Sequence, residues 1–219
     1  MRSDNETTES THPIPSASEI TRLHSQCVEQ WHQIEINNRY SGFLLTVCNQ
    51  HAANFRLWHE EDKARCPQST DEIIAAVKRE IDALNQRRND LIESLDIQIQ
   101  AILKNIGVSP TSSTPMNTET PGSAIDRLSI LSLRMYHYQE EYLRCKAESM
   151  AIDDGGRLQS IRERIQRCES QLCDLSTSLQ ELFDDLVTGK KRHQLYLQMK
   201  MYNDPNLNPA IYRHRSKMS

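Results

Sequence analysis

One stretch of the chain, residues 77–96, carries two stripes of side chains when it is read as a helix. At about 100° per residue, one stripe is apolar, and Arg88 stands in the middle of it. The stripe beside it is polar and consists of Lys78, Asp82, Asn85, Asn89, Glu93 and Asp96. A helix that only had to be buried would not carry so many polar groups at the edge of its core. The pattern predicts a polar seam at which a small ligand could bind.

Histidines that lie one helical turn from a carboxylate are a second group of candidate site residues, because such pairs can bind a metal ion. The pairs are His59 with Asp62, Glu29 with His32, and His137 with Glu140. Such a pair can bind one metal ion from one face of a helix, and helical bundles build two-metal sites from E-x-x-H motifs and further glutamates. Only Glu29 and His32 follow the E-x-x-H order. Binding of a divalent metal ion therefore remains a possibility, but no complete motif supports it. The alternative interpretation is that these groups are hydrogen-bonded structural residues.

Spacing limits which residues can share an ion. Asp82 and Glu93 lie on one helical face, eleven residues apart, and so do Asp126 and His137. Eleven residues rise about 16 Å along a helix, so neither pair can bind the same ion. A single metal site therefore uses at most one member of each pair.

Cationic side chains near the seam could instead bind an anion, because a guanidinium offers a fork of donors to a carboxylate or phosphate. For Arg88 we favour a structural ion pair over a ligand contact. Both tryptophans, each followed by a histidine, are most simply core residues. No residue is assigned a catalytic role. The candidate ligand-binding residues are Trp58, His59, Asp62, Arg65, Lys78, Asp82, Asn85, Arg88, Asn89, Glu93, Asp126 and His137.

Composition narrows the class of protein. The 219 residues include 26 Lys and Arg against 30 Asp and Glu, and this mild acidity argues against a dedicated nucleic-acid binder. No run approaches 18 apolar residues, and the polar start lacks the features of a signal peptide, so we expect a cytoplasmic protein with no membrane span. Six cysteines without C-x-x-C spacing are expected to be reduced thiols. Phosphate-binding loops, nucleophile elbows and zinc spacings are absent, so the sequence does not show whether the protein is an enzyme.

Helical periodicity and stop signals divide the chain. Capping boxes at 16–19 and 69–72 predict helix starts, and Pro67 and Gly107 predict ends. The predicted helices span about 17–66 with a break at 37–42, 69–106, 124–152, 157–189 and 195–202. Residues 1–16 are predicted to be a disordered leader, 17–202 a bundle domain with a flexible loop at 108–122, and 203–219 a turn and basic tail.

The helix after residue 156 has an unbroken 3-4 spacing of apolar residues, which predicts a coiled-coil-like seam. Its members are Leu158, Ile161, Ile165, Cys168, Leu172, Leu175, Leu179, Leu182 and Leu186. We expect helices of the same chain to cover the seam, with a homodimer as the alternative.

Helix register gives a further prediction. If the helices at 69–106 and 124–152 pack antiparallel from their shared loop, Glu93 lies level with His137. Across the Pro67 turn, His59 lies level with Lys78. These registers predict two separate polar clusters.

Four blocks of sequence, at residues 54–65, 78–96, 121–131 and 200–205, together resemble an uncharacterised bacterial family, domain of unknown function 4254. The resemblance covers roughly residues 20–212. It implies a bacterial cytosolic protein and assigns no reaction. Glu60-Glu61 followed by Glu93-x-x-Asp96 is also similar to the metal signature of all-α nucleotide pyrophosphohydrolases, but Ala64 stands in place of one acidic ligand.

The sequence therefore predicts an all-α protein, an antiparallel bundle of five or six helices in one domain. Three functions remain open. The first is binding of a small anionic or metal-linked ligand at the polar seam. The second is a structural or interaction role for the 158–186 seam. The third is a metal-dependent phosphohydrolase, which would need carboxylates to converge within about 4–5 Å.

Overall fold

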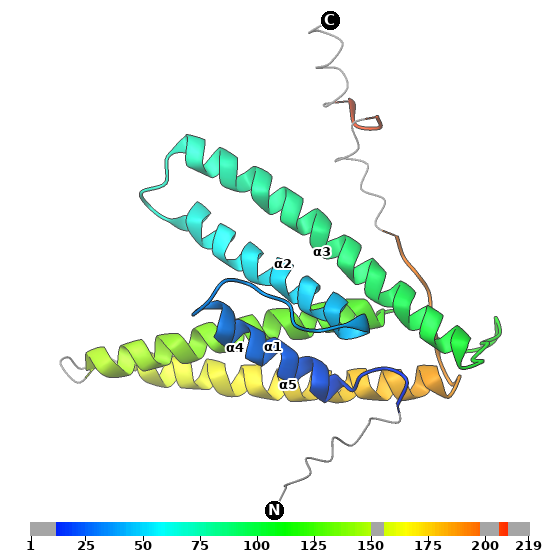
Figure 1. Cartoon of the computed structure of the whole chain (residues 1–219). Helices are drawn as coiled ribbons and strands as arrows, with labels where there is room; N and C mark the ends of the chain where they lie inside the picture. The colour runs from blue at the N-terminus through cyan, green and yellow to red at the C-terminus, as the bar shows by residue number, and fades with distance from the viewer. Residues whose placement is uncertain (1–11, 150–155, 198–205, 210–219) are drawn as a thin grey trace, which may run out of the picture.

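The computed structural model describes residues 12–149, 156–197 and 206–209, without the side chains of 148 and 149. Within these residues the protein is almost entirely helical, which confirms the predicted all-α class. The helices are α1 (Ala17–Trp31), α2 (Gly42–Arg65), α3 (Asp71–Asn105), α4 (Pro121–Ser149) and α5 (Arg157–Val187). In Figure 1, α2 and α3 form one antiparallel pair, α4 and α5 form another, and α1 lies across the second pair.

The start of α1 is fixed by the predicted capping box. The Ser16 hydroxyl accepts a hydrogen bond from the backbone N–H of Glu19, and the Glu19 carboxylate accepts one from the backbone N–H of Ser16. The leader was predicted to be disordered through residue 16, and this boundary is wrong. Ile14 is completely buried in the main core, because α1 leaves an apolar site beside its first turn. Residues 1–11 lie outside the described part of the chain.

The α2–α3 pair extends outward from the main core. Its outer part holds a small apolar cluster of Leu57, Val77, Ile81 and Leu84. The second capping box was predicted to begin at Ser69, but Thr70 is the N-cap of α3, with its hydroxyl accepting from the N–H of Ile73. The polar stripe of α3 becomes more buried along the helix: its first two members are exposed, the next three are half-buried and Asp96 is buried. The inner half of α3 therefore brings polar groups into the bundle.

The α4–α5 pair covers the predicted heptad seam. Every seam residue of α5 from Leu158 to Leu186 is buried or half-buried, and the helices that pack against α5 are α4 and α1. The seam is therefore covered within the chain, as expected. A homodimer stays a prediction.

The connection between α3 and α4 is fixed to the fold at two points. Two-residue strands β1 (Met116–Asn117) and β2 (Arg192–His193) pair in parallel, although no strand was predicted. Thr120 is buried, and α4 begins at Pro121, three residues before the predicted start. Residues 194–197 are not helical, and the rest of the predicted 195–202 helix lies outside the described residues.

None of the helices in the described part of the chain combines the length and apolar character needed to cross a membrane.

Candidate functional site

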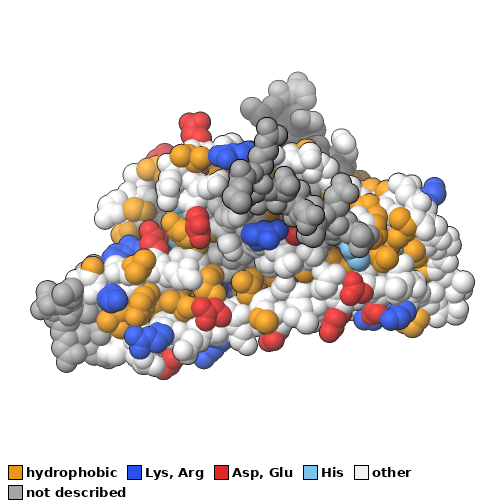
Figure 2. Space-filling view, turned by 60° about the horizontal axis from the view of Figure 1, so that its bottom comes forward, with side chains coloured by type: hydrophobic (Ala, Val, Ile, Leu, Met, Phe, Trp, Pro, Cys, Tyr) orange, Lys and Arg blue, Asp and Glu red, His pale blue; other side chains and the backbone are white. Residues whose placement is uncertain are grey.

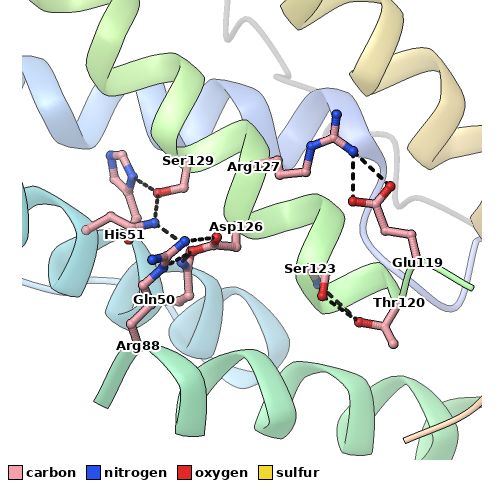
Figure 3. Close-up of polar contacts among 10 residues, drawn as sticks. Gln50, His51, Arg88, Glu119, Thr120, Ser123, Asp126, Arg127 and Ser129 are labelled. Carbon is pink, nitrogen blue, oxygen red and sulfur yellow. Dashed lines mark hydrogen bonds and ion pairs between the residues drawn. The ribbon is translucent and has the colours of Figure 1, made fainter. Parts of the chain in front are cut away.

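A buried aspartate on α4 joins three helices. Asp126 Oδ1 accepts hydrogen bonds from Gln50 Nε2 at 2.5 Å and Asn54 Nδ2 at 2.9 Å, both on α2. It also accepts one from Arg88 Nε at 2.7 Å, while Arg88 Nη2 donates to Oδ2 (Figure 3). The two Arg88 contacts form a bidentate ion pair between α3 and α4. This confirms the ion pair that the sequence favoured for Arg88.

Ser129 extends this network by one turn of α4. Its hydroxyl accepts from Asn54 Nδ2 at 2.9 Å and lies 2.7 Å from His51 Nδ1. His51 and His24 are both completely buried, and their ring centroids are 4.6 Å apart. Burial lowers the pKa of His51 to about 3 and the pKa of His24 well below its usual value, so both rings are neutral. Asp126 is therefore held among neutral donors and one cation.

We name this network the polar hub; it consists of Gln50, Asn54, Arg88, Asp126 and Ser129. Sequence analysis missed its α2 members. They lie in a helix that is buried on several sides and so shows little separation of polar and apolar faces. The only available signal was the i, i+4 spacing of Gln50 and Asn54, which places two amides on one face of the helix.

A cavity of about 340 Å³ opens beside the polar hub, between α2, α3 and α4. Five of the predicted ligand-binding residues line it, namely Trp58, Asp62, Arg65, Asn85 and Arg88. Apolar side chains, including Leu57 and Leu133, complete the wall. The predicted polar seam is therefore partly a cavity wall, formed where the α2–α3 pair meets α4.

Among the described residues, three hydrogen-bond donors of this wall are unused. Arg65 lies 2.9 Å from the carboxylate of Glu61 and 4.0 Å from that of Asp62, so its positive charge is already compensated within α2. Arg88 Nη1, the Asn85 amide and the Trp58 indole N–H have no hydrogen-bond partner in the described part of the chain. These unused donors suit a ligand that carries acceptor oxygens.

The remaining α3 candidates lie apart from this cavity. Lys78 and Asp82 form an ion pair one turn apart on the exposed part of the helix. Asn89 and Glu93 are half-buried further along α3. Lys78 thus pairs within its own helix, whereas the sequence-based register set it beside His59.

His59 and His137, which were predicted to lie in different clusters, lie together. Their ring centroids are 5.7 Å apart, and His32 at the end of α1 lies 5.2 Å from the first and 5.1 Å from the second. The prediction of two clusters is wrong because α4 crosses the inner half of α3 and then runs beside α1 and α2. Its first turn meets α3 at Gly122, and its middle reaches the other two helices.

Trp58 connects the histidines to the cavity. Its ring stacks on His137 with centroids 4.7 Å apart and planes 9° from parallel, and it also lines the cavity wall. Burial, with smaller contributions from the neighbouring histidines, lowers the pKa values of both His59 and His137. Both rings are therefore neutral at neutral pH, which is the form that binds metal ions.

The carboxylates of the phosphohydrolase-like signature do not gather at one point. In the described ranges, the only group of three or more side chains placed to hold a metal ion is His32, His59 and His137. Glu61 is paired with Arg65, Ala64 packs in the outer apolar cluster, and Asp96 accepts a hydrogen bond from Gly122 N at 2.7 Å. The geometry therefore gives no support to the phosphohydrolase hypothesis.

Asp96 leads to a prediction about pH. Burial raises its pKa, partly offset by the Thr120 hydroxyl and the Gly122 N–H, which stabilise the carboxylate. Because this pKa is higher in the folded state, protonation of Asp96 contributes stability that is fully present below the unfolded-state pKa of about 3.9. The contribution is lost as the pH rises through the folded-state pKa. An asparagine side chain at this position would not ionise. We therefore expect Asp96→Asn to match the wild type within about 1 kcal/mol at pH 4 and to be more stable at pH 7.

Urea denaturation of both proteins across this pH range would measure the difference. A stability difference that does not change between pH 4 and pH 7 would contradict the raised pKa of Asp96.

Comparison with known proteins identifies a family whose model matches this part of the chain. A family model described as a protein of unknown function (DUF4254) matches residues 45–195. The match spans α3, α4, α5 and most of α2, and so contains the polar hub and the whole cavity wall. No curated protein and no solved structure matches the chain.

Proposed function

The chain belongs to the DUF4254 family of proteins of unknown function, and we propose that it binds a small anionic molecule in the cavity between α2, α3 and α4. The observation that carries this proposal is the unused donor set of Arg88 Nη1, the Asn85 amide and the Trp58 indole. The cavity volume falls within the range of about 300–1,000 Å³ that is usual for small-molecule sites.

The polar hub prepares Arg88 for this role. Asp126 holds the guanidinium through Nε and Nη2, so the side chain is fixed before a ligand arrives and little conformational entropy is lost on binding. The Arg88 side chain is 26% exposed and that of Asp126 only 7%, so the guanidinium can meet a ligand while its partner stays buried. A carboxylate or phosphate can accept from Arg88 Nη1 and the Asn85 amide together.

The wall also favours a ligand with an apolar or planar part. Leu57, Leu133 and the ring of Trp58 provide apolar surface close to the donors. The ligand class is therefore a small organic anion rather than a bare inorganic ion. This site binds the ligand, and nothing in its wall identifies a nucleophile or a general base for a reaction.

A thermal-denaturation screen with matched probes tests the proposal. Benzoate is compared with benzamide, and a sugar phosphate with the same sugar. A ligand present at 100 times its dissociation constant stabilises the fold by about 2.7 kcal/mol. For a chain of this size that corresponds to a rise in Tm of about 5–10 °C. We expect the rise with an anionic probe and none with its neutral partner.

Two variants on the same helix make the test specific. Asn85→Leu replaces an unused donor in the wall, whereas Asp82→Asn changes a polar residue one turn away outside the cavity. We expect the first to abolish the anion-dependent rise in Tm and the second to leave it unchanged. Equal stabilisation by neutral probes, or an undiminished effect in Asn85→Leu, would rule out the proposed site.

A further inference from the structure

We propose that His32, His59 and His137 form a binding site for one divalent transition-metal ion, with zinc as the ion that fits best. The three side chains come from the end of α1, from α2 and from α4. This site is separate from the anion cavity, although Trp58 touches both. It requires no anionic ligand, so it stands or falls independently of the proposed function.

The distances between the donor atoms are close to those of a metal centre. One ring nitrogen from each histidine lies within 4.8 Å of the other two. In a tetrahedral site with Zn–N bonds of about 2.0–2.1 Å, ligand nitrogens are about 3.4 Å apart. Closing the remaining gap of up to about 1.4 Å needs only side-chain rotations, because the three ring centroids are already within 5.7 Å of one another.

Two ring nitrogens of the cluster have no other partner among the described residues. His32 Nε2 and His137 Nε2 are buried, and neither has a hydrogen-bond partner in the described part of the chain. Buried polar atoms are nearly always satisfied, and leaving one unpaired costs about 1–3 kcal/mol. A bound cation would satisfy both atoms.

In two of the histidines, the opposite ring nitrogen lies near an oxygen of the kind found beside metal ligands. His32 Nδ1 lies 2.7 Å from the carbonyl oxygen of Val28 and so donates its proton there, which leaves the Nε2 lone pair free. His137 Nδ1 lies 3.6 Å from the carboxylate of Glu140. A carbonyl or carboxylate on the far nitrogen orients a ligating histidine and strengthens it as a ligand. Glu140 thus acts on the site through His137, as a positioning residue.

Packing alone does not explain three imidazoles here. His32 stacks on Tyr136 with ring centroids 4.1 Å apart, and Phe55 meets His32 and His59 edge-on. These contacts use ring faces and edges, and a phenyl ring at any of the three positions could make them without burying an unpaired nitrogen. The aromatic neighbours instead fix the rings so that their nitrogens converge.

The donor set selects the class of ion. Three imidazole ligands suit zinc, cobalt, nickel or copper, whereas magnesium and calcium require oxygen ligands. Three protein ligands leave one tetrahedral position for water or an exogenous ligand. The site therefore has the ligand count of an open zinc centre.

Titration of the untagged, chelator-treated full chain with Co²⁺ and then Zn²⁺ tests the proposal. We expect one equivalent of cobalt to give the intense visible absorption of a tetrahedral complex and one equivalent of zinc to remove it. X-ray absorption of the zinc form should show nitrogen and oxygen ligands at about 2.0–2.1 Å and no sulfur at about 2.3 Å. This readout needs no variant. Failure to bind one equivalent, or a sulfur ligand, would overturn the proposal.

Variants assign the site to these residues. Changing His32, His59 or His137 singly to Gln should weaken zinc binding by more than about 100-fold, since even outer-shell changes cost about 10–100-fold. Glu140→Gln should weaken it by about 10-fold. His12→Gln, a histidine outside the cluster, is the control and should bind like the wild type. If the three cluster variants keep their helical circular dichroism and bind zinc as tightly as this control does, the assignment is wrong.

Discussion

Replacing Asp126 with Ala should reduce the free energy of unfolding by about 3–5 kcal/mol. The substitution leaves the Arg88 guanidinium without its bidentate partner and removes the acceptor used by Gln50 and Asn54. Breaking a buried ion pair from one side is costly because the remaining charge stays in a poorly solvated place. The cavity exposes part of Arg88, so we expect a value near the lower end of that range. Chemical denaturation followed by circular dichroism measures the loss.

Two further variants test whether the loss of stability in Asp126→Ala comes from the ion pair. Arg127 follows Asp126 directly, and its exposed ion pair with Glu119 also appears in Figure 3. Arg127→Ala should change stability by at most about 1 kcal/mol, as exposed pairs contribute little. The double variant Arg88→Met with Asp126→Leu should recover part of the stability lost in Asp126→Ala, because it leaves no unpaired charge although Gln50 still lacks its acceptor. A loss below about 1 kcal/mol in Asp126→Ala would mean that the polar hub does not hold the three helices together.

Replacing Gly122 with Val should cost about 3 kcal/mol of stability. A Cβ atom at this position would lie 2.5 Å from the backbone oxygen of Ile92 and 3.0 Å from Asp96 Oδ1. The Ile92 oxygen belongs to the middle of α3 and cannot move aside as a flexible side chain would. Separating the helices would also lengthen the hydrogen bond from Gly122 N to Asp96. Overpacking of this kind typically costs about 1–3 kcal/mol, and the rigid contact places Val at the upper end.

The neighbouring residue provides a control for the Gly122 prediction. Ser123→Ala removes only the contact between its hydroxyl and that of Thr120, and it should cost at most about 1 kcal/mol. Urea denaturation of both variants gives the comparison. If Gly122→Val is as stable as Ser123→Ala, α3 and α4 do not approach each other as closely as this fold requires.

One residue, Trp58, touches both proposed sites. Trp58 lines the anion cavity with one part of its ring system and stacks on His137 with a face. Occupancy of either site would restrain this side chain, so binding at one can change the affinity of the other through their common contact. Zinc titrations with and without a bound anionic probe would measure that coupling. The space-filling view in Figure 2 shows apolar side chains interspersed with charged ones over one face of the protein.

Much of the helical structure could be predicted because its signals are local. Ser16 and Glu19 form the capping box at the start of α1, and Gly107, with φ of +81°, follows the end of α3 as its stop signal. The heptad spacing of α5 identified its buried face from side-chain periodicity alone. Predicted segment boundaries were wrong where a contact from a distant part of the chain fixes the end of the segment. Ile14 is ordered by the core, and the first turn of α4 is fixed by Asp96 from α3.

The candidate site was predicted only in part. The polar stripe of α3 pointed to Asn85, and Arg88 stood out within the apolar stripe beside it. With Trp58, Asp62 and Arg65 from α2, they line one cavity. Lys78 and Asp82 belong to the same stripe but lie on its exposed outer part. The periodicity of one helix shows which residues share a face. It does not show where along that face the neighbouring helix begins and ends.

The sequence by itself determined most of the helical segments and the buried face of α5, and it favoured an ionic partner for Arg88. The tertiary structure alone decided that the partner is Asp126 and that His32, His59 and His137 meet. Helical periodicity is set by about four neighbouring residues, so it can be read along the chain. The meeting of three helices depends on their crossing angles and register, which a long connection such as residues 106–120 does not fix. Packing of side chains across all five helices sets them instead.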